Sequence, residues 1–570
     1  MLTTLTAPAF AGTWYIEDGD ITISAGESGN NVTQNKETTV NDHDTIITNR
    51  EEGASSHTVT IDAKDKDDKV EVTLKDVNID ASSRSEAAVS VTGKGDTTIE
   101  LDGNNELQGG DRHAGLEHNQ TVDSEGNVTS GKLTIQDDND NAGSLTATGG
   151  YFGAGIGGGS AKAGQVTITG GTITAISGDG AGIGGGQGNM GSNAGNADIE
   201  ISGGTIEATG GYASAGIGGG TWGDANIKIT GDAVIKNATG GVYGSGIGGG
   251  GGGNGDVTIS GNAKIENAQG GITGSGIGGG NGASGTVVIK DDSTVTATGG
   301  EAGAGIGGGY AGLGDVTIEG NTMVNATGGV GSAGVGGGYG AENDEDGNGS
   351  QITIKSNESG APNVTATGGE SSIDEETKEK IPGGAGIGSG VGDAKANITL
   401  EGKVTIVAKG GEGNAAIGDM NGEQVFTGLD GSITRYDSEG NDTTLPTDPG
   451  YPVPADTSSS GGSADASVQE SVFPGLVVTD KDGQRISYTS IRGNNVLSIR
   501  VGRFTASLRA SLATLRQLRA EGIDTITFQT ILCSTTLSVD ELLAMGDEDT
   551  EVVLTHHIRS STLTVGGKAV

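Results

Sequence analysis

The sequence predicts an all-β protein: a single-stranded parallel β-helix, or solenoid, followed by a small α+β domain. Three observations predict this fold. Of the 570 residues, 113 are glycine and only 3% are aromatic, so a thick core of large side chains is excluded. A block reading Ala-Gly-Ile-Gly-Gly-Gly, or a near copy, recurs ten times at intervals of about 30 residues. Between the blocks lie short runs in which branched apolar residues alternate with polar ones.

The recurring block excludes a disordered glycine-rich chain. Disorder would share this composition, but it gives no reason to keep one aliphatic residue at one phase of a long period. That aliphatic residue is Leu116, Ile156, Ile183, Ile217, Ile247, Ile277, Ile306, Val335, Ile387 and Ile417. The 52-residue interval between Val335 and Ile387 contains an acidic insertion around residues 371–382.

Each repeat contains three short strands, as the unit 256–260, 263–271 and 274–280 illustrates. In Val257-Thr258-Ile259 the apolar residues flank a polar one, which is typical of a strand with one buried face. Such strands are too short to be stable alone, so neighbouring repeats must stack, with like strands about 4.8 Å apart. We therefore expect Ile247, Ile277 and Ile306 to lie one above the next inside the solenoid.

The glycines of the block are expected where the chain turns close to the next coil, because a Cβ there would clash or forbid positive φ. A phosphate-binding loop is the functional alternative. It is excluded because no Lys-Ser or Lys-Thr follows any copy of the block.

Composition divides the chain into five segments. Residues 1–11 resemble the end of a secretory signal with the small-x-small site Ala9-Phe10-Ala11, although a basic start is missing. An N-terminal cap with irregular coils is expected next, then the glycine-rich repeats, a Pro/Ser/Gly linker and the α+β domain. These four segments are 12–119, 120–440, 441–467 and 468–570.

The last segment is less rich in glycine and shows helical patterns. Ser538, followed by two acidic residues, predicts the start of a short second helix. A stripe of leucines predicts a first helix that ends at Gly522, namely Leu508, Leu512, Leu515 and Leu518.

Charge and cysteine content exclude several function classes. The net charge is −42, and the segment from 468 contributes almost none of it, with eleven acidic and ten basic residues. Such a chain repels phosphate backbones, so we expect no nucleic-acid binding. No stretch is long and apolar enough for membrane insertion. Cys533 is the only cysteine, so neither an internal disulfide nor a structural thiolate site for zinc is available.

Catalysis finds little support in the repeats. No arginine occurs between Arg112 and Arg435, and no histidine between His118 and His556. A lyase that removes a proton from a uronate needs cationic groups there. Hydrolysis by paired carboxylates stays open as an alternative, although no two acids stand out. We expect a protein that is not an enzyme.

Two acidic turns are candidate calcium sites, because they concentrate the oxygen ligands that calcium prefers. The candidate ligands are Asp137, Asp138 and Asp140 in the first turn, and Asp344 and Asp346 in the second. The alternative interpretation is a solvated loop that its charge keeps polar.

Six aromatic residues occur at repeated phases of the period and are candidate ligand-binding residues. They are Tyr151, Tyr212, Trp222, Tyr243, Tyr310 and Tyr339. On exposed turns such side chains can stack on sugar rings, whereas the alternative is that they fill gaps left by glycine. A threonine ladder for ice binding is not expected, because its outer positions become Glu200, Lys228 or Lys236 in later coils.

Residues 75–80, 87–91 and 98–107 resemble the opening coils of carbohydrate-binding β-helix proteins secreted by anaerobic Gram-positive bacteria. The resemblance spans about residues 70–160. It implies a right-handed, polysaccharide-lyase-like β-helix, association with calcium, and binding of acidic plant polysaccharides. The Ala-Gly-Ile-Gly-Gly-Gly coils and the C-terminal segment are similar to parts of large surface proteins from the same organisms.

Together these features predict a secreted or cell-surface protein that binds extracellular polysaccharide without catalysis. One alternative is a structural stalk or adhesin that displays the C-terminal domain, and a second is a polysaccharide-degrading enzyme. The sequence leaves open the sugar, the mode of surface attachment and the oligomeric state.

Overall fold

The computed structural model describes most of the chain. The described residues are 12–139, 141–188, 195–373, 378–392, 395–426, 429–450, 475–481, 483–486, 488–493, 495–501, 503, 505–530, 533–548, 550–557 and 560–569. The chain forms two compact units that divide between residues 451 and 452. Among the described residues, no helix has the length and apolar character required to cross a membrane.

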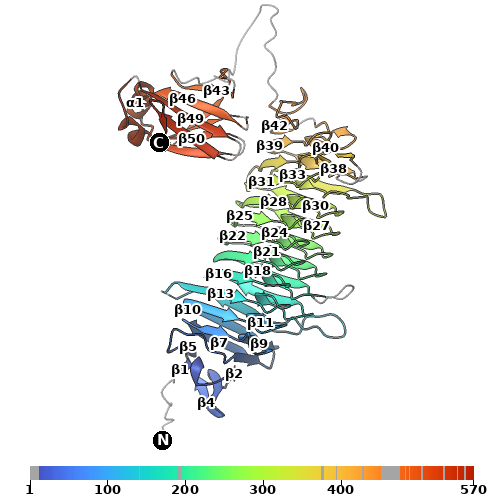
Figure 1. Cartoon of the computed structure of the whole chain (residues 1–570), viewed down its shortest axis with the longest axis vertical. Helices are drawn as coiled ribbons and strands as arrows, with labels where there is room; N and C mark the ends of the chain where they lie inside the picture. The colour runs from blue at the N-terminus through green and yellow to red at the C-terminus, as the bar shows by residue number, and fades with distance from the viewer. Residues whose placement is uncertain are drawn as a thin grey trace, which may run out of the picture. The chain divides into compact units, whose positions relative to one another are not determined.

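The first unit is a parallel β-solenoid in which each coil contributes a strand to each of three faces (Figure 1). The first face holds the aliphatic residue of the glycine block, and we call it the glycine face. Its parallel strands are β2 Ile21–Ala25, β6 Val59–Ala63, β9 Val89–Gly93, β11 Leu116–His118, β14 Ile156–Gly157, β17 Ile183–Gly184, β20 Ile217–Gly218, β23 Ile247–Gly248, β26 Ile277–Gly278, β29 Ile306–Gly307, β32 Val335–Gly336, β37 Ile387–Gly388 and β40 Ile417–Asp419.

The second and third faces follow in every coil and are linked through the long strand β10, Asp96–Gln108. The second face contains β1 Thr13–Tyr15, β5 Ile46–Thr48, β7 Lys69–Lys75, β12 Leu133–Gln136, β15 Gly164–Ile168, β18 Ala197–Ile201, β21 Ala225–Ile229, β24 Gly255–Ile259, β27 Gly285–Ile289, β30 Gly314–Glu319, β33 Ser350–Lys355 and β38 Ala396–Glu401. The third contains β8 Asn78–Asp80, β13 Gly143–Thr148, β16 Thr172–Ile176, β19 Thr205–Thr209, β22 Val234–Thr239, β25 Lys264–Gln269, β28 Thr294–Thr298, β31 Met323–Thr327, β34 Asn363–Thr367, β39 Lys403–Lys409 and β42 Asp430–Tyr436.

The core of the solenoid is a stack of aliphatic side chains, as predicted. Ile247 lies opposite Ile277, and Ile277 lies opposite Ile306, in the parallel register of the glycine face. All three side chains are completely buried. Stacking like residues in this way fills a thin interior without aromatic rings.

Shorter elements close the first unit and interrupt it once. A 3-10 turn, Ile16–Asp18, and two antiparallel strands, β3 Asn30–Gln34 and β4 Glu37–Asp42, cover the first coils. The acidic insertion carries the antiparallel pair β35 Ser372–Ile373 and β36 Lys380–Ile381. Strand β41, Gly422–Glu423, pairs with the last strand of the glycine face.

The second unit contains two sheets and two helices. Its five-stranded sheet comprises β43 Val477–Thr479, β46 Ala506–Ser511, β49 Glu551–His557, β50 Ser560–Val565 and β51 Lys568–Ala569. Its four-stranded sheet comprises β44 Thr489–Gly493, β45 Val496–Arg500, β47 Thr525–Gln529 and β48 Ser534–Ser538. The helices are α1 Leu512–Ala520 and α2 Val539–Leu543.

The helix prediction for the second unit is right for α2 and partly wrong for α1. The Ser538 hydroxyl accepts from Glu541 N and starts α2, as expected. Leu508, however, belongs to β46 and not to the predicted helical stripe. The alternating pattern of residues 506–511 decides this, because it continues the sheet until Ser511 caps α1.

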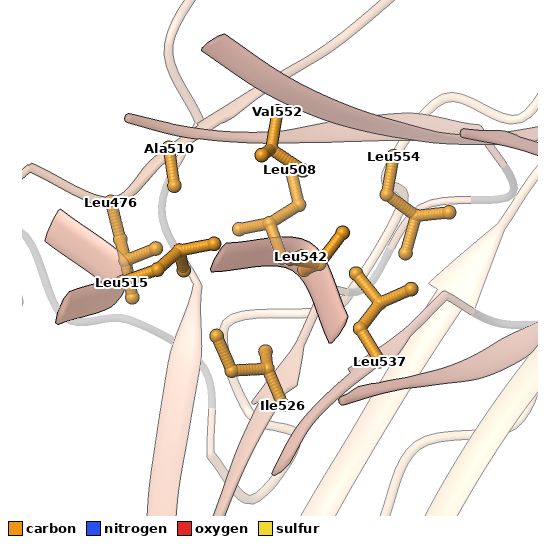
Figure 2. Close-up of a pocket in the computed structure, with 9 residues that line it drawn as sticks. All are labelled: Leu476, Leu508, Ala510, Leu515, Ile526, Leu537, Leu542, Val552 and Leu554. Carbon is orange, nitrogen blue, oxygen red and sulfur yellow. The ribbon is translucent and has the colours of Figure 1, made fainter. Parts of the chain in front are cut away.

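Side chains from both sheets and both helices meet in the core of the second unit, around an apolar gap (Figure 2). Leu508, Leu515 and Leu542 are among the residues that line it. The gap measures only about 10 Å³ and offers no polar partner to a water molecule, so it is a packing defect and not a ligand site.

Candidate functional site

Two sets of turns flank the glycine strands, and they are hydrogen-bonded to each other. The pre-glycine turn joins the third face to the glycine face, as at residues 241–244, and the post-glycine turn follows the glycine block, as at 250–254. The amide of Asn281 donates to the carbonyl of Tyr243 over 2.8 Å, although these turns belong to successive coils. Equivalent bonds are Ser160 to Arg112, Gln187 to Phe152, Gly251 to Ala213, Tyr310 to Thr273, Tyr339 to Ala302 and Val391 to Gly331. We call this joined surface the turn seam.

The seam covers the outer side of the glycine face, which explains the glycine block. Residues 246–250 are all buried, although their strand has only two residues. A Cβ built on Gly248 would lie 2.0 Å from the carbonyl oxygen of Gly278, and the φ of Gly248 is +135°. Backbone therefore packs directly on backbone, and only glycine fits. This outcome confirms the architectural interpretation of the block.

The seam brings the six predicted ligand-binding aromatics onto one surface, one at each of six successive levels. Each level pairs a pre-glycine turn with the post-glycine turn of the following coil. At the second level the link is Ser214, whose hydroxyl donates to the carbonyl of Asp179 and lies 3.4 Å from the Thr221 hydroxyl. In order of level, the aromatics are Tyr151, Trp222, Tyr212, Tyr243, Tyr310 and Tyr339.

Two pairs of neighbouring rings on the seam are in contact. The centroids of Tyr212 and Tyr243 lie 5.2 Å apart at 90°, and their hydroxyls are 3.4 Å apart. The centroids of Tyr310 and Tyr339 lie 5.9 Å apart. The hydrogen bond to Tyr243 raises the pKa of Tyr212. Trp222 packs on Gly252 of the next coil, where a Cβ would lie 2.1 Å from the indole.

Much of this aromatic surface is open to solvent. The exposed fractions are 61% for Tyr151, 57% for Tyr212, 40% for Trp222 and 39% for Tyr310. Ile272 lies on the same seam and is 47% exposed. Trp222 and Tyr310 also pack against Gly252 and Gly340, so filling gaps left by glycine accounts for part of their placement and leaves the rest of each ring exposed.

The sequence analysis missed several apolar members of the seam. Phe152 lies 4.5 Å from the Tyr151 ring, and Ile272 and Val330 occupy the turn position equivalent to Tyr151 and Tyr212. The signal was available, because Ile272 and Val330 directly follow the same Gly-Gly pair as Tyr151, and Phe152 is the next residue after Tyr151. The prediction included only tyrosine and tryptophan.

The second predicted calcium turn is held together by its own backbone. Asp344 Oδ1 accepts from the amides of Asp346 and Asn348, at 3.0 and 2.7 Å, and Oδ2 accepts from Asn348 Nδ2. These hydrogen bonds hold the pKa of Asp344 below its usual value. Asp346 is exposed.

The first predicted calcium turn is built around a carboxylate that the prediction did not include. Glu100 Oε1 accepts from the amides of Asp138 and Asn139 at 2.9 and 3.1 Å. Asp137 Oδ2 accepts from the Gly143 amide, while its buried Oδ1 has no hydrogen-bond partner. Asp140 lies outside the described residues. Within the described chain, no group of three His, Cys, Asp or Glu side chains converges on a metal position.

A recurring turn motif, Asp-x-x-Gly-Asn or a close variant, accounts for the geometry of the second loop. Asp123, Asp344 and Asp437 each accept from the amide four residues later, and Asp480 accepts in the same way from Gln484. The glycine at the fourth position has positive φ each time. The motif is therefore a local turn that forms in different parts of the chain.

Comparison with known families agrees with this architecture. A family model described as a beta helix repeat matches residues 141–160, 166–187, 199–221 and 287–310. Each matched segment ends in or just after a glycine block. The chain is a parallel β-helix protein. No curated protein and no solved structure matches this β-helix chain.

Proposed function

We propose that the β-helix binds extracellular polysaccharide along the turn seam, as a secreted or cell-surface protein without catalysis of its own. The observation that carries this proposal is the aromatic side chain present at each of six successive levels of the seam. The apolar face of a sugar ring stacks on an aromatic ring, and the phenol hydroxyls can hydrogen-bond to sugar hydroxyls. A polymer of sugars suits a surface that repeats itself.

The spacing of the levels supports a polymeric ligand. Coils repeat at about 4.8 Å along the solenoid, which is close to the length of one extended sugar residue. Because each level offers a new ring, a linear glycan that runs along the seam would meet a similar contact at every step. Affinity then comes from many weak contacts acting together.

The turn seam is also rigid before any ligand arrives. Its backbone is fixed by hydrogen bonds both within each set of turns and between the two sets. Tyr212 and Tyr243 are further fixed by their edge-to-face contact. A preformed surface loses little conformational entropy on binding.

A structural stalk is the second candidate function, supported by the nearest-neighbour stacking of coils that are covered at both ends. A stalk needs no exposed aromatics, whereas a glycan-binding surface depends on them. The β-helix fold itself occurs in both enzymes and non-enzymes. The fold alone therefore does not decide between catalysis and either of these two functions.

A polysaccharide-binding assay with seam variants tests the proposal. A glycan array of the whole chain first selects the ligand, and affinity electrophoresis then measures retention. We expect the double variant Tyr212→Ala/Tyr243→Ala to bind about thirtyfold more weakly, since two stacking contacts of about 1 kcal/mol each are lost.

The matched control is Met323→Ala, because Met323 is 46% exposed on the third face, away from the seam. It should bind like the wild type. Unchanged retention of the tyrosine double variant, or no retention of any glycan by the wild type, would favour the stalk.

A further inference from the structure

The charges on the turn seam are of one sign over five of the six aromatic levels, from Trp222 to Tyr339. From residue 178 to 341 the described pre-glycine and post-glycine turns contain Asp179, Asp224 and Glu301, and neither lysine nor arginine. Asp224 and Glu301 are exposed, and Asp179 is half-buried. Of the lysines of these coils, Lys228, Lys236 and Lys264 lie on strands of the second and third faces, and Lys290 lies in the turn between those faces.

On the turns of the seam that the structure describes, lysine and arginine occur only beyond the two ends of this run. At the N-terminal end, the Arg112 guanidinium lies 5.5 Å from the Phe152 ring and 3.8 Å from the Asp111 carboxylate. At the C-terminal end, Lys380 is paired with Glu412. The stretch from Trp222 to Tyr339 therefore offers no cation to an anionic polymer.

We propose that the polysaccharide bound along the turn seam is a neutral one, built from uncharged sugars. This inference rests on the proposed function and names its ligand class. A polyuronate or a phosphate-linked polymer carries an anion on nearly every unit, and the units that pass Asp179 or Glu301 would lie within one Debye length of about 8 Å of that carboxylate at physiological salt. The net charge of −42 adds to this repulsion over the whole chain.

Uncharged sugars avoid this repulsion and find suitable partners on the seam. Stacking on Tyr212, Tyr243 or Tyr310 is insensitive to charge, and phenol hydroxyls donate or accept hydrogen bonds. The proposal differs from the acidic ligands implied by the resemblance at residues 70–160, because recognition of those ligands requires cations at the site.

Affinity electrophoresis of the whole chain in two sets of gels tests the inference. One set contains soluble neutral polymers, namely hydroxyethylcellulose, xyloglucan, galactomannan and mixed-linkage β-glucan, and the other contains polygalacturonate or alginate. We expect retention by at least one neutral polymer, equal at low and high salt, and none by the acidic polymers at low salt.

Charge variants provide the matched comparison. Asp179→Asn/Glu301→Gln should keep its retention by the neutral polymer. Asp179→Lys/Glu301→Lys should become measurably retained by polygalacturonate, and only at low salt, because exposed charge contacts are weak and screened by salt. Retention of the wild type by an acidic polymer would overturn this inference and leave the proposed function standing. If no polymer retains the wild type, the proposed function itself fails.

Discussion

Arg435 and Asp448 form a doubly hydrogen-bonded ion pair inside the last coil of the solenoid, with both side chains fully buried. Arg435 Nε donates to Asp448 Oδ2 over 2.7 Å, and Nη2 donates to Oδ1 over 3.0 Å. The guanidinium also donates to Glu423 and to the carbonyls of Ile417 and Gln424. The buried guanidinium of Arg435 therefore joins three segments of the chain at the C-terminal end of the solenoid.

Replacing Arg435 by alanine should open the C-terminal end of the solenoid. The variant leaves the carboxylates of Asp448 and Glu423 without their cation, and breaking a buried pair in this way costs about 3–5 kcal/mol. Because coils contact only their neighbours, the effect should be greatest in the last coil. Hydrogen exchange of residues 417–436 measures it, together with the urea midpoint.

Arg509→Ala is the control for the loss of an arginine. Arg509 pairs with Glu551 at 3.2 Å, but both side chains are about half exposed, so less than about 1 kcal/mol should be lost. Equal, small effects of the two substitutions would show that Arg435 does not hold the end of the solenoid.

Glycine substitutions should separate packing positions from permissive ones. Gly248→Ala places a methyl group 2.0 Å from the Gly278 carbonyl oxygen at positive φ, so we expect a loss of at least about 1–3 kcal/mol. Gly53→Ala meets no atom within 4 Å and should be neutral or slightly stabilising. Thermal unfolding followed by circular dichroism compares the two variants. A Gly248→Ala protein with wild-type stability would contradict the seam packing described above.

The fold was predictable because one aliphatic residue recurs at the same position of every repeat. Ile247 and its equivalents recur wherever the backbone returns to the same face, and parallel stacking turns sequence period directly into spatial register. The end of the solenoid was not predictable in this way. Arg435 has no equivalent in the other repeats, so no period marks it. Its partner Asp448 reaches it only because the chain folds back after β42.

The sequence predicted the aromatic residues of the candidate site, but it did not predict that they lie on one surface. Tyr243 and Tyr310 occur at different phases of the repeat, and the sequence gives no reason to expect both on one surface. They meet because the glycine strand is only two residues long, which brings the turns on its two sides together. The second acidic loop also matches a local turn motif, and its calcium site stays a prediction.

Calcium should leave the melting temperature unchanged at millimolar concentration. Asp344 already accepts from the amides of Asp346 and Asn348, and a cation would have to displace or reorient these donors. Differential scanning calorimetry with calcium and with EDTA tests this expectation. An increase in melting temperature with calcium that Asp344→Asn abolishes would instead establish the predicted calcium site.

His113 should make the protein more stable at mildly acidic than at alkaline pH. Its Nδ1 lies 2.8 Å from Glu117 Oε2, and this hydrogen bond raises the pKa of His113. A raised folded-state pKa stabilises the fold below the unfolded value of about 6.5, and this contribution is lost as pH rises through the folded value. The decline in melting temperature over that window should be smaller in His113→Asn. An identical decline in the variant would exclude His113 as its source.

His118 should act with the opposite sign. It is almost fully buried, and burial lowers its pKa although Nδ1 and Nε2 face the carbonyl oxygens of Val91 and Gly131 at 3.2 and 2.9 Å. The unfolded chain therefore takes up this proton first, so stability falls as pH drops below about 6.5. In His118→Gln an amide that does not titrate can donate to the same carbonyls, and this acid-side decline should become shallower while the alkaline side keeps its slope. The double variant His113→Asn/His118→Gln tests both residues together, because they are close in sequence. The slopes of melting temperature against pH should become shallower on both the acid and the alkaline side. An unchanged slope on the acid side would show that His118 takes up its proton without loss of stability.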